Sequence, residues 1–290
     1  MSDAGQPDLG SPEANRTGAD EVYILGDREQ VSYTGTRTAM EWIPFFVPHL
    51  RPGMSLLDCG CGVGSITLDL AERVAPGQVV GVDLDESQLA MARAEAERRG
   101  LSNIRFETAS IYDLPFPEDS FDAALAHTLL FHLREPLRAL RVLRRMLKPG
   151  GVVCVSDDDW STLVFSPTDP HLRRAWELGT RFVEHNGASP FYARHLRGLM
   201  LEAGFARTEG HAVAADHYGT LAETRKQAQF LDGLFSHPPV IATILGEGWA
   251  DEAELEQMRA AALAWGERPD AFLAWMYCAA IGWVGEETEG

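Results

Sequence analysis

Apolar and polar residues change period in a regular order along the first half of the chain. Short apolar runs at 55–58, 79–82, 104–107, 121–126 and 152–156 predict strands, whereas 65–74, 86–99 and 136–147 have the spacing of helices. Gly100 follows the second helix, and Lys148-Pro149-Gly150-Gly151 stops the third. Strands that alternate with helices of this length build βαβ units, so we expect an α/β fold with a mostly parallel sheet and helices on both faces.

The segments on either side of this region are less regular. Residues 1–20 have no apolar period and predict a disordered tail, whereas 21–50 predict a helical cover in which Pro44 and Pro48 break or kink a helix over 38–49. Beyond residue 156, the pattern predicts helices at 172–185, 191–203, 221–234 and 252–265 and a strand at 211–215. The aromatic-rich segment 271–284 fits a helix or a strand by its pattern alone.

Composition narrows the partners and the compartment. The net charge of −18 opposes binding to nucleic acid and to anionic membranes, and the basic residues at 141–148 are more simply a solvated helix flank. The sequence has no signal pattern and no run of 18 apolar residues, which favours a cytoplasmic protein. Its four cysteines predict reduced thiols, and Cys59-Gly60-Cys61 lacks the further ligands of a metal site, so no metal is expected.

The strongest chemical signal is a glycine-rich turn between the first strand and the helix after it. In Asp58-Cys59-Gly60-Cys61-Gly62-Val63-Gly64, the glycines let the backbone turn sharply and let a ligand approach the main chain. The third glycine comes one residue earlier than in the dinucleotide-binding pattern. At the end of the next strand, the Asp83 carboxylate is placed to accept both hydroxyls of a ribose, the alternative being a helix N-cap or a loop carboxylate.

These two features, followed by segments 114–122 and 147–151, resemble the class I S-adenosylmethionine (SAM) dependent methyltransferases, especially the ubiquinone/menaquinone-biosynthesis type. A looser similarity runs through Arg37-Thr38-Ala39, 157–160, His185-Asn186-Gly187 and 265–283, and resembles a bacterial and fungal group that includes the gliotoxin dithiol S-methyltransferases. The resemblance implies a Rossmann-like, seven-stranded sheet with an added helical lid, in which 271–284 is an antiparallel strand. It also implies SAM as the cofactor and S-adenosylhomocysteine (SAH) as its product.

The resemblance assigns cofactor contacts position by position. Asp83 would hold the ribose, and Asp58 would lie near the amino group of the methionine part, which the three glycines would line. Ser110 stands where the family often has an aspartate that binds the adenine. Tyr33 and Arg37, which precede the core in the sequence, would fold over SAM, and Arg37 would reach a carboxylate. The expected cofactor-binding residues are Asp58, Gly60, Gly62, Gly64, Asp83, Leu84, Ser110, Ile111, Tyr33 and Arg37.

Methyl transfer mainly requires that the enzyme align the donor with the acceptor and exclude water, and it needs a base only where the acceptor must lose a proton. His127, at the end of the fourth strand, is the candidate base or acceptor-orienting group, with a structural wall residue as the alternative. Segment 157–159 contacts the acceptor or is a solvated acidic loop. Aromatic residues beyond it form either an acceptor pocket or plain core. The expected acceptor-binding residues are Asp159, Trp160, Asn186 and Phe191.

The sequence therefore predicts a SAM-binding core at 51–156, with acceptor-binding lid helices and the last strands at 157–290. The expected activity is transfer of a methyl group to a small-molecule acceptor, on an oxygen, nitrogen, sulfur or carbon atom that the sequence does not determine. A non-catalytic SAM-binding or regulatory protein and, with less support, a nicotinamide-dependent oxidoreductase are the alternatives. The chain could form a homodimer.

Overall fold

The computed structural model describes residues 35, 37–214 and 217–286. Within them, seven strands form one sheet in the order β3-β2-β1-β4-β5-β8-β6, and the two-residue strand β7 adds to β8. The first five are parallel, and β8 runs antiparallel to β5, β6 and β7. The predicted α/β fold with a mostly parallel sheet is thus confirmed. The strands are β1 (Leu56–Cys59), β2 (Val79–Asp83), β3 (Ile104–Thr108), β4 (Phe121–His127), β5 (Leu147–Ser166), β6 (Arg207–Val213), β7 (His217–Tyr218) and β8 (Phe272–Trp283).

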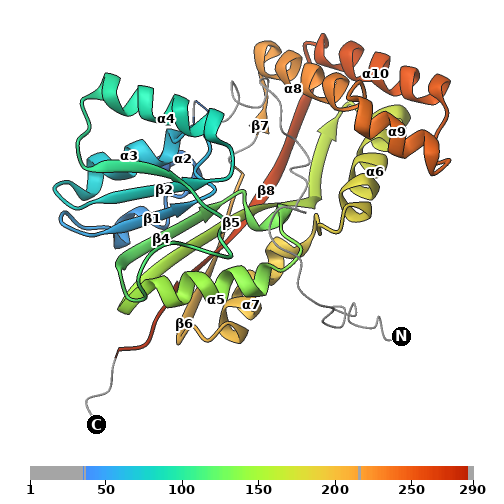
Figure 1. Cartoon of the computed structure of the whole chain (residues 1–290). Coiled ribbons are helices and arrows are strands. Elements are labelled where there is room, and N and C mark those ends of the chain that lie inside the picture. Colours follow the sequence, from blue (N-terminus) through green and yellow to red (C-terminus); the bar gives the residue numbers. More distant parts are fainter. Residues whose placement is uncertain (1–34, 36, 215–216, 287–290) are drawn as a thin grey trace.

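Helices cover both faces of the sheet because the central strands are apolar on both faces. Alternate side chains of these strands, such as Leu57 and Leu56, belong to two different apolar clusters. One cluster includes α5 (Pro136–Met146) and α7 (Leu196–Glu202), and the other includes α2 (Ala39–Trp42) and α3 (Ser65–Val74), which Figure 1 shows on opposite sides of the sheet. The helix α4 (Glu86–Arg99) packs beside α3 and β3.

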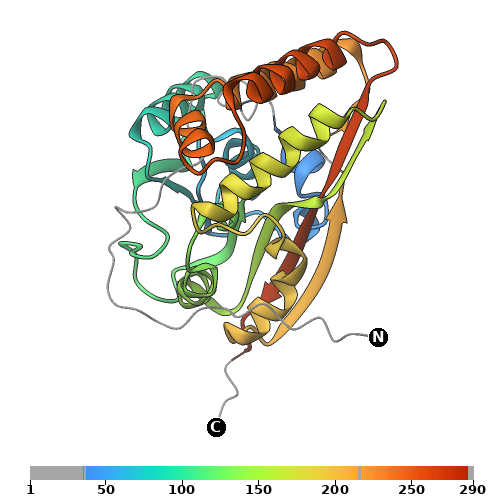
Figure 2. The ribbon, with the colours of Figure 1, turned by 90° about the vertical axis from the view of Figure 1, so that its right-hand side faces the viewer.

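The strands β5 and β8 extend well beyond the rest of the sheet (Figure 2). The predicted strand 152–156 is therefore too short, and 157–159 is not the solvated acidic loop that was one alternative. These three aspartates lie within β5, pair with Tyr277 and its neighbours on β8, and are all buried. Each carboxylate has a polar partner: Asp158 has Trp160 on the same strand, and Asp157 and Asp159 have Tyr192 and Arg194 from a distant turn, so the strand can continue past its predicted end.

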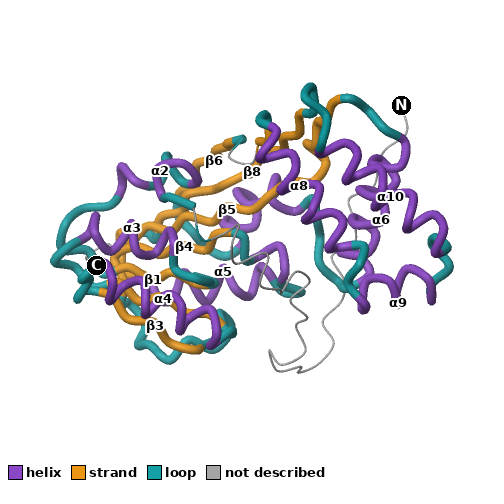
Figure 3. The backbone as a smooth tube through the Cα atoms, turned by 90° about the horizontal axis from the view of Figure 1, so that it is seen from above, coloured by secondary structure: helices purple, strands orange, loops and turns teal. Residues whose placement is uncertain are grey.

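The extended ends of β5 and β8 carry a separate group of helices, visible to the right of the core in Figure 3. They are α6 (Pro170–His185), α8 (Leu221–Leu234), α9 (Pro238–Gly246) and α10 (Glu252–Gly266). The predicted helix over 191–203 is instead a 3-10 turn, η4 (Tyr192–His195), followed by α7. The sequence analysis did not predict α9, which begins with two prolines; proline is tolerated in the first turn of a helix.

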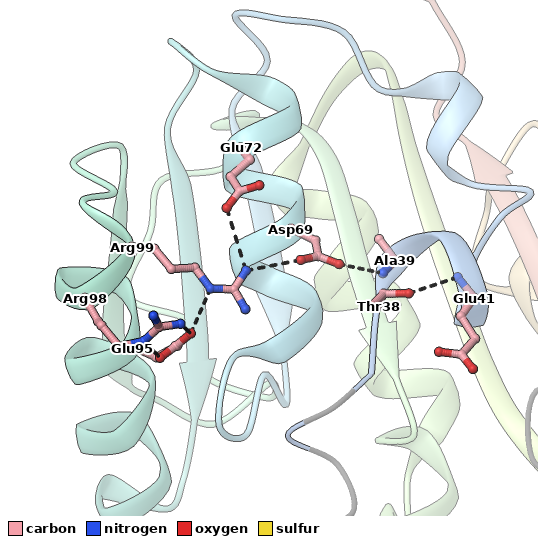
Figure 4. Close-up of polar contacts among 8 residues, drawn as sticks. All are labelled: Thr38, Ala39, Glu41, Asp69, Glu72, Glu95, Arg98 and Arg99. Carbon is pink, nitrogen blue, oxygen red and sulfur yellow. Dashed lines mark hydrogen bonds and ion pairs between the residues drawn. The ribbon is translucent and has the colours of Figure 1, made fainter.

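The N-terminal segment is fastened to the core by polar contacts. The predicted break at the prolines is present, since α2 ends at Trp42 and the 3-10 turn η2 (Val47–His49) follows. Asp69 on α3 accepts a hydrogen bond of 3.1 Å from the backbone nitrogen of Ala39 and faces Arg99 of α4 at 3.3 Å (Figure 4). These contacts fix the start of α2, and with it the position of Arg37. The predicted tail at 1–20 lies outside the described residues.

Candidate functional site

Two cavities adjoin at the carboxyl ends of the parallel strands, where open α/β sheets bind ligands. The small cavity has a volume of about 370 Å³ and the large one about 510 Å³. Thr128, directly after β4, lines both. Its φ of 53° is unusual for a β-branched residue, and its backbone nitrogen donates a hydrogen bond of 2.8 Å to the Ser156 carbonyl oxygen. The junction of the two cavities is therefore built on a constrained backbone.

The glycine-rich turn forms one wall of the small cavity, but its glycines have different tasks. Gly60 lines the cavity, and a Cβ there would lie 2.9 Å from the Cδ1 atom of Leu129. Gly64 faces away from it, because a Cβ at Gly64 would lie 2.9 Å from the Cβ of Ala92 and 3.0 Å from the ring of Phe106. Gly64 thus lets α3 and the turn pack on α4 and β3.

Asp83 ends β2 at the edge of the small cavity. Its two carboxylate oxygens accept hydrogen bonds from the backbone nitrogens of Gly62 at 2.9 Å and Asp85 at 3.0 Å. Asp85, and not Asp83, caps α4 through the nitrogens of the first turn. Beside it, the Leu84 side chain is 56% exposed, although it is apolar. The helix-cap alternative for Asp83 is therefore wrong, whereas its two backbone hydrogen bonds leave the loop-carboxylate alternative open beside the ribose prediction. Leu84 offers an uncovered apolar surface to a ligand.

The small cavity is also lined by the predicted residues Ser110 and Ile111, together with a histidine that the sequence did not indicate. This residue is His132, which is buried beneath the cavity, and burial lowers its pKa to about 4. A neutral imidazole at this position adds no charge to the wall. No local sequence signal distinguished it, because the 3-10 turn η3 (Leu130–His132) that positions it has no apolar period.

Asp58 lies behind the glycine turn and does not line either cavity. It is buried, and the Thr67 hydroxyl donates a hydrogen bond of 2.6 Å to it. Burial, with a smaller contribution from the Asp83 charge, raises the pKa of Asp58 to about 7 despite that hydrogen bond. A carboxyl group that is half ionised near neutral pH can respond strongly to a cation bound nearby.

His127 sits behind the junction of the cavities, in contact with Arg37 and two aromatic rings. The Arg37 guanidinium lies 3.4 Å from Nε2 of His127 and donates a hydrogen bond of 3.2 Å to the Thr128 hydroxyl. Trp42 meets the imidazole edge-on, and Tyr277 stacks on it. Burial first, and the Arg37 charge second, hold the pKa of His127 well below its usual value. The imidazole is therefore neutral, and its role as a base stays a prediction.

The large cavity has mainly aromatic walls. Arg37 and Asp158 line it near the junction, whereas α6 and α8 supply its far side. Trp160 is the predicted acceptor-binding residue that the structure places there; it packs against Phe131 and Trp176. Sequence reasoning missed most of this wall, because its residues come from segments far apart in the chain. The aromatic lining residues are Trp160, Trp176, Tyr218, Phe230, Phe235, Trp275 and Tyr277.

The other predicted acceptor residues are not among those that line the two cavities. Asp159 points to the opposite face of β5 from Asp158, where Arg194 binds it through two nitrogens at 2.5 and 2.6 Å. Asn186 caps the end of α6 and donates 2.8 Å to the Phe182 carbonyl oxygen. Phe191 is packed against the apolar core. The structure thus brings Trp160 to the large cavity. Arg37, which was expected to contact the cofactor, lines this same cavity and not the small one, and Tyr33 lies outside the described residues.

The described residues hold no cluster of three or more histidine, cysteine, aspartate or glutamate side chains able to bind a metal ion. Among these same residues there is also no helix long and apolar enough to cross a membrane.

Comparison with known proteins identifies relatives. A family model for a methyltransferase domain matches residues 57–155. An uncharacterized methyltransferase of Schizosaccharomyces pombe is 32% identical over 196 residues, which cover 66% of this chain and 70% of that protein. The demethylmenaquinone methyltransferase of Lactococcus lactis is 32% identical over 198 residues, or 60% and 76% of the two chains. The solved SAM-dependent methyltransferase of Aquifex aeolicus is similar in fold, with a TM-score of 0.50 at 21% identity over 65% of this chain and 93% of that one.

Proposed function

Because this chain belongs to the class I SAM-dependent methyltransferases, we propose that it moves a methyl group from SAM to a small molecule held in the large cavity. The observation that carries this proposal is the junction at Thr128, where the small and large cavities meet. Two reactants bound in adjoining cavities would face each other there, which is the main requirement of an in-line transfer.

The residues of the small cavity fit SAM and its product SAH. The Asp83 carboxylate can accept hydrogen bonds from ribose hydroxyls, and the exposed Leu84 side chain can pack against an adenine ring. Ser110, Ile111 and Gly60 also line this cavity, and Gly60 has no side chain that would fill it. The bound cofactor supplies a methyl group activated on a sulfonium sulfur.

The acceptor is proposed to be a small molecule for reasons of size and charge. A volume of about 510 Å³ with apolar walls and a few polar groups is typical of a small-molecule site. The net charge of −18 gives a nucleic acid or an anionic membrane no general attraction. Aromatic walls would exclude water from the reacting atoms, and Arg37 would hold Thr128 and His127 in place behind them. The looser resemblance to dithiol S-methyltransferases, the cytoplasmic location and the homodimer stay predictions.

Calorimetric titration tests the cofactor assignment and both alternatives. We expect SAH to bind and NADH not to bind, and we expect SAH to form when SAM and a mixture of small acceptors are supplied. Asp83→Ala should weaken SAH binding at least about tenfold, since it removes hydrogen bonds to a charged acceptor. Asp270→Ala is the control, because that carboxylate is exposed and pairs with Arg268 outside both cavities. Unchanged SAH affinity in a folded Asp83→Ala protein would refute the ribose assignment, and NADH binding would favour the oxidoreductase.

A further inference from the structure

Asp158 is the buried carboxylate that faces the large cavity. Its side chain is 91% buried at the cavity wall. One oxygen, Oδ2, accepts a hydrogen bond of 2.7 Å from the Trp160 indole nitrogen. The other, Oδ1, has no partner within the described part of the chain. A buried carboxylate oxygen left without a donor is costly, so this atom is suited to a ligand that brings a donor of its own.

The position of Asp158 places it close to the junction of the cavities. It lies two residues beyond Ser156, whose carbonyl oxygen accepts the Thr128 backbone hydrogen bond. Along the pleat, Asp158 and Trp160 share one face of β5, whereas Asp157 and Asp159 face the other and bind Tyr192 and Arg194. Only the middle carboxylate of this run therefore lines the cavity.

The charges of the large cavity balance. Arg37 and Lys226 line it together with Asp158 and Asp232, so the formal charges of the lining sum to zero. A cationic acceptor would meet the two positive side chains, and an anionic one would meet the two carboxylates. A neutral molecule with an aromatic body suits both the balanced charges and the aromatic walls.

We infer that Asp158 accepts the proton of the acceptor, and that the acceptor is a neutral aromatic molecule with a hydroxyl group as the methyl-accepting atom. This inference rests on the proposed function. A hydroxyl is favoured over a thiol because O–H is a strong hydrogen-bond donor and S–H a weak one. It is favoured over an amine because a hydroxyl must lose its proton as the new bond forms, whereas a neutral amine attacks through its lone pair.

The step balances without another reactant. The hydroxyl oxygen forms a bond to the methyl carbon, the bond between carbon and sulfur breaks, and its electron pair stays on sulfur. The hydroxyl proton moves to Oδ1 of Asp158, which gives a methyl ether, SAH and a neutral carboxyl group. Release to solvent as the site opens returns Asp158 to its ionised form.

Burial raises the pKa of Asp158 to about 6, against the lowering effects of the Trp160 hydrogen bond, a hydrogen bond from its own backbone N–H and the Arg37 charge. The group is therefore ionised at neutral pH but basic enough to take a proton during the reaction. The Asp159 carboxylate adds negative charge, and the neutral His127 adds none. The titratable and charged side chains that surround it are Arg37, His127, Asp157, Asp159, Tyr218, Lys226, Asp232 and Tyr277.

A binding experiment on the SAH complex tests this inference without turnover. The probes are phenol, 2-naphthol and 2-hydroxyfluorene, each with its methyl ether, which keeps the shape and removes the donor. The variants are Asp158→Asn and, as a matched control, Asp157→Asn on the opposite face of the same strand. In Asp158→Asn, the Trp160 nitrogen takes the single amide oxygen, so the amide nitrogen replaces Oδ1 and cannot accept the hydroxyl.

We expect the wild type to prefer an aryl alcohol over its ether by about tenfold, and the preference to vanish in Asp158→Asn but persist in Asp157→Asn. The wild-type preference for the alcohol should also weaken as the pH falls through about 6. SAH affinity should stay within about twofold in all three proteins, because Asp158 does not line the small cavity.

Several results would overturn the inference. They are an unchanged preference in Asp158→Asn, an equal loss in Asp157→Asn, tighter binding of the matched thiol or amine, or no binding of any aryl alcohol. If the wild type does not bind SAH at all, the proposed function itself is refuted, so the two failures are distinguishable. With SAM, the rate of ether formation should fall in Asp158→Asn and rise with pH through about 6 in the wild type.

Discussion

The packing role of Gly64 leads to a prediction in which a second glycine serves as the control. Gly64 and Gly100 both have left-handed backbones, with φ of 76° and 70°. They differ in what an added methyl group would meet. At Gly100 nothing lies within 4 Å, whereas at Gly64 the Cβ would lie 2.9 Å from Ala92 Cβ and 3.0 Å from Phe106. Replacing each with alanine therefore separates backbone strain from steric overlap.

The expected magnitudes follow from these two contributions. Left-handed backbone costs an alanine about 1–2 kcal/mol at either position, and the smaller entropy of its unfolded chain offsets part of this cost equally in both. Overlap within a packed core costs a further 1–3 kcal/mol or so, at Gly64 alone. Normal contact between carbon atoms is about 3.5–4.0 Å, so Ala92 and Phe106 must move in Gly64→Ala.

Urea denaturation of both variants and the wild type measures the free energy of unfolding. We expect Gly64→Ala to lose about 1–3 kcal/mol more than Gly100→Ala. SAH binding should weaken only in Gly64→Ala, because a shift of the turn also moves Gly60 and the backbone nitrogen that bonds Asp83. Equal losses of stability would refute the assignment of Gly64 to packing. A loss of SAH affinity with no loss of stability would show that Gly64 contacts the ligand.

Two further predictions concern the carboxylates of β5. The pKa of Asp158, raised from 3.8 to about 6, means that its ionised form destabilises the folded protein, and at ~1.4 kcal/mol per pKa unit the penalty is about 3 kcal/mol. Asp158→Asn should therefore raise the free energy of unfolding above pH 6, with the gain vanishing towards pH 4; a constant gain would contradict the raised pKa. Burial alone would raise the pKa of Asp159, but hydrogen bonds from Arg194 and Ser161 outweigh it and lower that pKa. Arg194→Met should destabilise the protein by roughly 2 kcal/mol at neutral pH, a value discounted because Arg194 is partly exposed. The destabilisation should become smaller as acid protonates the Asp159 carboxylate. Thermal melts at several pH values measure this, and a destabilisation independent of pH would refute it.

The sequence by itself determined the elements whose signals lie within a few residues. The helices α3, α4 and α8 begin and end at the predicted residues. Asp85 caps the start of α4 and Gly100 its end, and Thr220 forms a capping box with Glu223 at the start of α8. Such caps and the periodicity beside them are local, so they need no knowledge of the rest of the fold. The glycine turn and Asp83 were found for the same reason.

Tertiary structure alone decided which residues line the large cavity. Arg37, Asp158 and Tyr277 lie far apart in the sequence but adjoin one cavity, because β5 and β8 pair along their extended ends. The choice of Asp158 over Asp159 depends on the pleat of a strand whose length the pattern underestimated. The buried Tyr192 and the partly exposed Arg194 help to make three successive aspartates tolerable within a sheet, and both come from a distant turn. The sequence could place the glycine turn, but only long-range pairing could say which carboxylate faces the large cavity.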